Sequence, residues 1–412
     1  MSINEVEITP FVDIASRPRG FPAMATTRSS PAGMWIPVRD EWDGVPGRLL
    51  TEGAFLPKPL PSDVVLSSRT HRALADAQEA LGRLDEATVR LLDPSALVRA
   101  TQVREVQRSA RLDGISTALL EVLVSQLPGV RPETAVEPAI SSYLRAGDTG
   151  FAALDAGVTD HVALMSSVAA AFAGVDTAGT DIWRTDHSWL GGTDPFLLAS
   201  PPGAASRAAF EQFAAWSSGE TEIPVLAKVA LGHFFHEVVR PFRHGNGHIA
   251  RLYVGLELAR SGVLRGQVLP LSTWIDRNLT EYRARIRRLA DEGDYEQWIA
   301  FFAEGIRAVS RDELLLITKL EAAHEALHRK LSGRRTGNIR KVLTALIATP
   351  VTNHRQVAEL HGITTKNAGD VCARLVDAGV LHRLDEKPYA KAYYAPDLLR
   401  LLSLTDPMPT RP

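Results

Sequence analysis

Residues 233–260, HFFHEVVRPFRHGNGHIARLYVGLELAR, constrain the fold more than any other stretch of the chain. Apolar residues at helical spacing begin near Pro224, and proline is compatible with the first turn of a helix. Pro241 must end that helix, because proline lacks the N–H that a helix interior needs. The apolar period resumes at Ile249, after Gly245-Asn246-Gly247. The sequence therefore predicts two buried helices joined by a short glycine-rich loop.

This loop is a candidate anion-binding site. A new helix N-terminus presents unpaired backbone N–H groups, and the helix dipole also favours a negative charge there. A plain helix–helix turn is the alternative, since glycine-rich turns are common.

Residues 240–251, RPFRHGNGHIAR, resemble the signature of the Fic (Fido) family, H-P-F-x-[D/E]-G-N-G-R-x-x-R. Most members of that family transfer AMP, or another phosphate-containing group, from a nucleotide to a protein hydroxyl. The matching positions are Pro241, Phe242, Gly245, Asn246, Gly247 and Arg251. The resemblance implies that Gly245, Asn246, Gly247 and Arg251 bind the phosphates of a nucleotide such as ATP.

Three functional positions depart from this signature. Arg240 replaces the family's catalytic histidine, and it cannot accept a proton because the pKa of arginine lies above ~12. It can instead bind a phosphate or a carboxylate. His244 replaces the acidic residue that orients Mg²⁺, an ion that prefers oxygen ligands. His248 replaces a phosphate-binding arginine and removes a fixed positive charge. Together these changes argue against the family's usual mechanism.

The replacements also suggest a different chemistry. His244 and His248 lie four residues apart at the start of the second helix, so both imidazoles could face one centre. Imidazoles serve acid–base catalysis near neutral pH, which makes His244, His248 and Arg240 the candidate catalytic residues. A divalent metal held by His187, His236, His244 and His248 is the weaker alternative, because no H-E-x-x-H motif or cysteine pair supports it.

Residues 109–114, SARLDG, resemble the family's inhibitory motif, [S/T]-x-x-x-E-[G/N]. In that class a glutamate on an N-terminal helix pairs with the second signature arginine and blocks productive nucleotide binding. Ser109 and Asp113 are therefore the candidate inhibitory residues, although aspartate is one methylene shorter than glutamate. A salt bridge between Asp113 and Arg251 is expected, since a guanidinium suits a carboxylate. A turn carboxylate before Gly114 is the alternative.

Residues 183–192, WRTDHSWLGG, interrupt the helical period and resemble the family's flap. A flap is a hairpin that docks the backbone of a protein target by strand addition. Gly191 and Gly192 suit its tight turn. The candidate flap residues are His187, Trp189, Leu190 and Gly191.

The expected fold is mainly α: a Fic-type helical core with a small β-hairpin flap, followed by a C-terminal winged helix-turn-helix domain. We expect a Fic-associated N-terminal region at 1–95, the core at 96–310, a linker helix at 311–335 and the winged helix at 336–400. The N-terminal residues up to about 65, rich in Pro and Gly, are predicted to form an irregular arm. Separate helices are predicted at 295–306 and 312–330.

In the winged helix, helices are predicted at 339–348, 354–360 and 366–378, with a wing hairpin at 381–394. Thr352 and either Thr364 or Thr365 are suitable N-caps. A recognition helix would present Thr365, Lys366 and Asn367 to a DNA groove. Nearby acidic residues dilute the basic patch, and many winged helices pair only with proteins, so a homodimer stays an alternative.

Composition limits the remaining possibilities. The net charge of −2 argues against strong global attraction to nucleic acid or a membrane. The single cysteine, Cys372, excludes an intrachain disulfide and fits a reducing cytoplasm. No apolar run is long enough to cross a bilayer, so we expect a cytoplasmic protein without a membrane partner.

The leading hypothesis is a diverged Fic-type enzyme that acts on a nucleotide or another phosphate-bearing substrate. Arg240, His244 and His248 would occupy its centre. One alternative is a catalytically inactive Fic protein that regulates through its winged helix. Another is ordinary AMP transfer to a protein with a different base.

Overall fold

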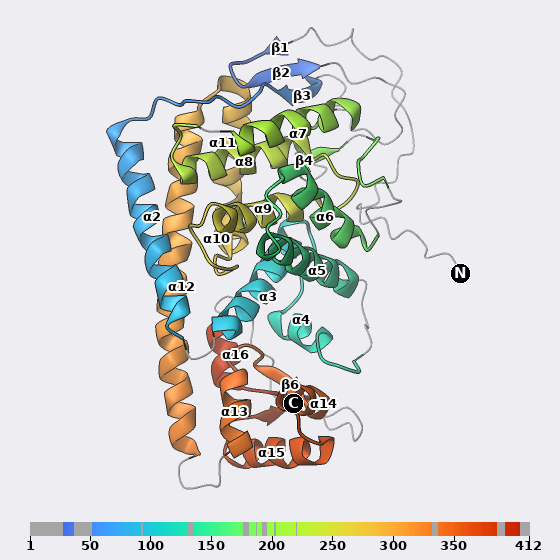
Figure 1. The fold of residues 1–412 in the computed structure, drawn as a ribbon, viewed down its shortest axis with the longest axis vertical. Coiled ribbons are helices and arrows are strands. Elements are labelled where there is room, and N and C mark those ends of the chain that lie inside the picture. Colours follow the sequence, from blue (N-terminus) through green and yellow to red (C-terminus); the bar gives the residue numbers. More distant parts are fainter. Residues whose placement is uncertain are drawn as a thin grey trace, which may run out of the picture.

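The computed structural model describes residues 28–36, 52–91, 94–130, 136–175, 181–186, 188–191, 196–201, 203–219, 221–331, 337–384 and 392–403. This part of the chain is mainly helical, as predicted, with small sheets at either end (Figure 1). The helices of the larger, N-terminal part are α2 (Ser68–Val89), α3 (Pro94–Leu112), α4 (Leu119–Ser125), α5 (Val136–Asp155), α6 (His161–Ala173), α7 (Gly203–Ser218), α8 (Val225–Val239), α9 (Asn246–Arg260), α10 (Leu271–Arg277), α11 (Leu279–Glu292) and α12 (Tyr295–Lys330). None of the helices in the described ranges is long and apolar enough to cross a membrane.

The two predicted central helices are α8 and α9, and both are buried along nearly their whole length. Pro224 is the N-cap of α8, and Gly245 is the N-cap of α9 in the left-handed conformation, with φ 71°. The loop between α8 and α9 is anchored by buried Pro241, Phe242 and Asn246, whereas Arg243 and His244 are exposed. The prediction of two buried helices and a glycine-rich loop is confirmed.

Helix α12 contradicts the prediction of separate helices at 295–306 and 312–330, since it runs unbroken for 36 residues. Its buried face continues through Val309 and Leu316, and the Ser310 hydroxyl donates to the Ile306 carbonyl inside the helix, 2.7 Å away. Nothing in the junction therefore breaks the helix. Helices α12 and α2 lie side by side, and α12 extends from the N-terminal part to the C-terminal unit (Figure 1).

A five-stranded sheet corrects the prediction of an irregular arm before residue 65. Its order is β1-β2-β3-β5-β4, with three strands from the N-terminal segment and two from the middle of the chain. These strands are β1 (Arg28–Ser29), β2 (Gly33–Ile36), β3 (Ala54–Pro57), β4 (Trp189–Gly191) and β5 (Phe196–Ala199). Strands this short give little two-residue periodicity, and β3 pairs with β5 far along the sequence. Local pattern could not reveal them.

The C-terminal unit contains the helices and the hairpin that the sequence predicts for 336–400. Its elements are α13 (Gly337–Ala345), β6 (Val351–Asn353), α14 (His354–His361), α15 (Thr365–Asp377), β7 (His382–Arg383), β8 (Ala392–Tyr394) and α16 (Pro396–Leu402). The strands form an antiparallel sheet in the order β6-β8-β7. Thr364 caps α15 as expected, but Asn353 rather than Thr352 caps α14. Thr352 cannot cap, because it pairs with Tyr393 inside the sheet.

Candidate functional site

The loop between α8 and α9 is braced from within. The Asn246 side chain accepts from the Phe242 N–H at 2.8 Å and donates to the Phe242 carbonyl at 2.6 Å. Arg240, the C-cap of α8, has φ 47° and ψ 63°. Among the residues that the structure describes, it is the one non-glycine residue with a positive φ. This conformation is strained for a residue with a Cβ. Asn246 therefore shapes the loop, and the loop holds Arg240 in an unusual backbone state.

Arg184 fixes the end of α8 from outside. Its guanidinium donates to the carbonyls of Val239, Arg240, Asp186 and Pro201, the first at 3.0 Å. These carbonyls belong to the end of α8, to the flap segment itself and to the residues that follow it. Burial lowers the pKa of Arg184 to about 10, and nearby Arg240 adds to this effect. Arg184 thus joins the flap segment to the loop.

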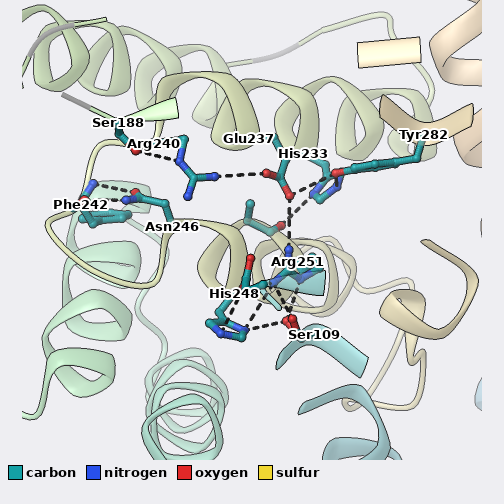
Figure 2. A network of polar contacts seen from close by, with 12 residues as sticks. Ser109, Ser188, His233, Glu237, Arg240, Phe242, Asn246, His248, Arg251 and Tyr282 are labelled. Carbon is teal, nitrogen blue, oxygen red and sulfur yellow. Dashed lines mark hydrogen bonds and ion pairs between the residues drawn. The ribbon is translucent and has the colours of Figure 1, made fainter. Parts of the chain in front are cut away.

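Arg240 and Arg251 both face Glu237, as Figure 2 shows. Arg240 Nη1 lies 3.7 Å from Glu237 Oε2, and Arg251 Nη1 lies 3.7 Å from Glu237 Oε1. Arg240 also donates from Nε to the Ser188 hydroxyl at 2.9 Å. Burial raises the pKa of Glu237, although the two guanidiniums oppose that rise. One buried carboxylate therefore sits between two cations.

Glu237 also ends a buried hydrogen-bond chain. His233 must donate from Nδ1 to the Ala250 carbonyl, 2.8 Å away, because a carbonyl only accepts. Burial lowers the pKa of His233 to about 4, so its Nε2 is free of a proton near neutral pH and accepts from the Tyr282 hydroxyl at 2.8 Å. The same Tyr282 hydroxyl also donates to Glu237 Oε1, 3.1 Å away. One hydroxyl therefore links the His233 imidazole to the Glu237 carboxylate.

Asp113 lies across the start of α9. Its Oδ2 atom accepts from Arg251 Nη2 at 2.7 Å and lies 3.1 Å from His248 Nε2. Its other oxygen lies beside Gly247, only 3.1 Å from the place where a Cβ would stand. Burial opposes ionisation of Asp113, but Arg251, His248 and Arg240 outweigh it and lower its pKa. The predicted salt bridge between Asp113 and Arg251 is present.

Ser109 completes the cluster around His248 (Figure 2). Its hydroxyl lies 2.7 Å from His248 Nδ1 and accepts from Arg251 Nε at 2.7 Å. Because Arg251 supplies a proton to this oxygen, the serine can donate its own proton to Nδ1. His248 then carries its proton on Nε2, toward Asp113. Burial lowers the pKa of His248 to about 4, so this imidazole is neutral.

Helix α3 is anchored so that Asp113, just past its end, reaches the centre. Arg104 of α3 lies 2.8 Å from both carboxylate oxygens of Glu313 in α12. Glu105 accepts from the Ser272 N–H of α10 at 2.9 Å. Gly114 follows with φ 86°, so the turn expected after Asp113 also exists. The ion pair and the turn carboxylate are therefore not exclusive alternatives.

The other predicted histidines lie in different places relative to this cluster. His244 is exposed on the loop, whereas His248 is only 6% exposed. His236 lies in the core, against the rings of His161, Phe213 and Tyr253. His187 and Gly192 lie outside the described residues. Among the residues that the structure does describe, no group of three or more His, Cys, Asp and Glu could hold a metal ion.

The flap prediction is met in part. Trp189, Leu190 and Gly191 form β4, but the strand that pairs with it starts at Phe196, beyond the expected end at 192. In the sheet order, β4 stands at the edge, where a further strand could add. Trp183 instead makes an isolated bridge with Phe242 of the loop. The described flap residues are thus tied to the loop at one end and to a sheet edge at the other.

Sequence reasoning missed three residues of the site: Arg184, Ser188 and Glu237. Arg184 and Ser188 bind groups that only the fold brings near, so no local pattern identifies them. Glu237 offered one signal, a charged residue in the last turn of a largely apolar helix. A buried charge in such a place is usually paired.

Comparison with known proteins supports the fold. Residues 71–152 match the model of the Fic/DOC family N-terminal region. A Fic family protein from Desulfovibrio desulfuricans G20 superposes with a TM-score of 0.53 at 15% identity, over 82% of this chain and 98% of that one. Fic-1 from C. elegans gives 0.46 at 18% identity, over 60% and 74% of the two chains. A Fic domain-containing signaling protein from Bacteroides thetaiotaomicron VPI-5482 gives 0.44 at 14% identity, over 61% and 97%.

Proposed function

We propose that this chain, which has the fold of Fic proteins and carries their N-terminal region, binds a phosphate-bearing ligand such as a nucleotide between α8 and α9. Asp113 competes with that ligand for the same donors. The Fic fold is generally one of nucleotidyl or phosphate transfer, so a nucleotide is the ligand class to test first. The observation that carries the proposal is the position of the Asp113 carboxylate.

That carboxylate already behaves as a bound anion. It accepts from the Arg251 guanidinium and the His248 imidazole, and it rests beside Gly247 in the first turn of α9. A phosphate oxygen would meet the same guanidinium, the same imidazole N–H and the same helix N-terminus. Since the Asp113 side chain is 36% exposed, solvent can replace its contacts when it leaves.

The experiment is titration calorimetry of ATP into the full-length protein and its Asp113→Ala variant. Asp113 makes two charge-assisted contacts, and partial exposure weakens both, so its removal should tighten ATP binding about ten- to hundredfold. Adding Arg251→Ala to that variant should abolish the gain. Equal affinity of the wild type and Asp113→Ala would contradict the competition.

Asp276→Asn is the matched control. Asp276 pairs with Arg108 and Arg111 of α3, so the variant removes an ion pair of the same helix but leaves Asp113 in place. It should not tighten ATP binding. Tightening by both variants would mean that loosening α3, rather than removing a competing anion, opens the centre.

Transfer chemistry is the second candidate, and His248 is the residue that favours it. Arg240 cannot act as a base, whereas the neutral imidazole of His248 can accept a proton at Nε2 once the proton that now faces Asp113 has moved to Nδ1. The edge strand β4 offers a docking place for a protein target. ATP labelled at the α-phosphate should then label a target, or the chain itself, with Asp113→Ala but not with Asp113→Ala/His248→Ala. His244→Ala tests the sequence prediction for that residue, and unchanged labelling would remove it from the mechanism.

A regulatory role through the C-terminal unit is favoured by a different contact. Asn353, the N-cap of α14, donates from Nδ2 to the carbonyl of Pro128 at 2.9 Å, just after α4. Helix α4 follows Asp113 along the chain and also contacts β6. Thr365, Lys366 and Asn367 are exposed at the start of α15, where DNA would be read. Hydrogen exchange in α14 and α15 should change when ATP binds Asp113→Ala, and no change would leave the two sites uncoupled.

A further inference from the structure

We propose that this centre takes its phosphate ligand as the free anion, without a divalent cation, and that Arg240 and Arg251 supply the neutralising charge. This inference rests on the proposed function. It names the ligand more narrowly, as a nucleotide or phosphate monoester not complexed with magnesium.

The oxygen donors in the centre are already used. Magnesium requires six oxygen ligands in near-ideal octahedral geometry, usually with one or two carboxylates. Asp113 is the group that the ligand displaces. The Asn246 side-chain oxygen accepts from the Phe242 N–H, so it points to the backbone of the loop. His244 stands where the Fic signature has its acidic residue, and imidazole is a poor ligand for this hard cation.

Glu237 is the carboxylate that stays when Asp113 leaves, but its surroundings exclude a dication. It is 1% exposed, and its two oxygens lie 3.7 Å from Arg240 and from Arg251. The Tyr282 hydroxyl lies 3.1 Å from one of them. A magnesium ion here would lie beside two fixed positive charges, at a buried carboxylate that solvent does not reach. The residues present therefore do not fit the ion.

The two arginines replace the charge that the ion would bring. Arg251 is 5% and Arg240 is 18% exposed, so both charges are weakly screened. Guanidinium groups match phosphate oxygens in bidentate geometry and stay protonated at any physiological pH. Once Asp113 has left, the centre holds two guanidiniums, the Glu237 carboxylate between them, a neutral imidazole and the N-terminus of α9. That set keeps a net positive charge and suits an anionic ligand.

The test uses the full-length Asp113→Ala variant, in which the competing carboxylate is gone. ADP is titrated in excess MgCl₂ and again in EDTA. We expect the dissociation constant to be about threefold or more weaker in MgCl₂, because excess magnesium converts ADP to a complex that the centre does not take. A dissociation constant that magnesium leaves unchanged or tightens would overturn the inference while leaving the proposed function intact. If ADP and ATP fail to bind in either buffer, the proposed function itself fails.

Variants of Arg240 separate charge from structure. In the same background, Arg240→Gln should weaken ADP binding in EDTA by about tenfold or more, and Arg240→Lys should weaken it less because it keeps the charge. Arg243→Gln is the matched control: Arg243 is exposed on the same loop, so the variant should change affinity by less than about threefold. If Arg240→Lys binds no better than Arg240→Gln, or Arg240→Gln no worse than Arg243→Gln, the assignment of charge to Arg240 is wrong.

Discussion

His161 is a buried imidazole of α6 that should make folding sensitive to acid. It is 1% exposed and packs against the rings of Phe210 and Phe213, and within the described residues neither of its ring nitrogens has a hydrogen-bond partner. Burial lowers its pKa to about 3, and Arg260 and Lys228 act in the same direction. The folded chain therefore keeps His161 neutral under conditions where the unfolded chain protonates it.

The sign and size of the effect follow from this shift. The unfolded histidine titrates near pH 6.5, so its stabilisation is fully present above that pH. As the pH falls, each unit removes about 1.4 kcal/mol until the folded pKa is reached. At about pH 5 the loss from His161 alone is therefore about 2 kcal/mol. In many domains this is a large fraction of the free energy of unfolding.

The perturbation is His161→Phe, measured by urea unfolding at about pH 7.5 and about pH 5. The wild type should lose about 2 kcal/mol more than the variant between these two conditions. Any packing change caused by phenylalanine acts equally at both and cancels in the comparison. His71→Phe, at an exposed position of α2, should behave as the wild type does. Equal losses in the wild type and His161→Phe would refute the reasoning.

Three further perturbations test the frame of the site. Arg240→Gly and Arg240→Ala both remove the guanidinium, but glycine accepts φ 47°, so urea unfolding should find the glycine variant more stable by about 1 kcal/mol; equal stabilities would show an unstrained backbone. Arg104→Leu leaves Glu313 buried and unpaired and should destabilise the fold by about 3–5 kcal/mol. The double variant Arg104→Leu/Glu313→Leu should restore most of that stability. A small loss in Arg104→Leu would show that the ion pair contributes little. Gly245→Ala would place a Cβ 2.4 Å from the Phe172 ring at φ 71°, so it should destabilise by about 2 kcal/mol or more and abolish ATP binding in the Asp113→Ala background; unimpaired binding would mean that the loop adapts.

The central helices could be predicted because their signals are local. An apolar period, a proline on each side and a glycine at the turn all lie within a few residues of α8 and α9. The pairing of Asp113 with Arg251 was also predictable, but only through the resemblance of both motifs to one family. In contrast, the break predicted inside α12 was wrong, since no residue there interrupts the helix. The apolar pattern along the sequence did not by itself distinguish one long helix from two.

The sequence by itself determined which charges and bases this centre has: Arg240 in place of a histidine, and His248 in place of an arginine. Only the tertiary structure decided what those groups contact. It set Arg240 against Ser188, left His244 exposed and placed Asp113 on the start of α9. Side-chain identity fixes the protonation and charge that a residue can carry. Its partners and its burial come from segments more than a hundred residues apart in sequence, such as α3 and α9, and only folding brings these together.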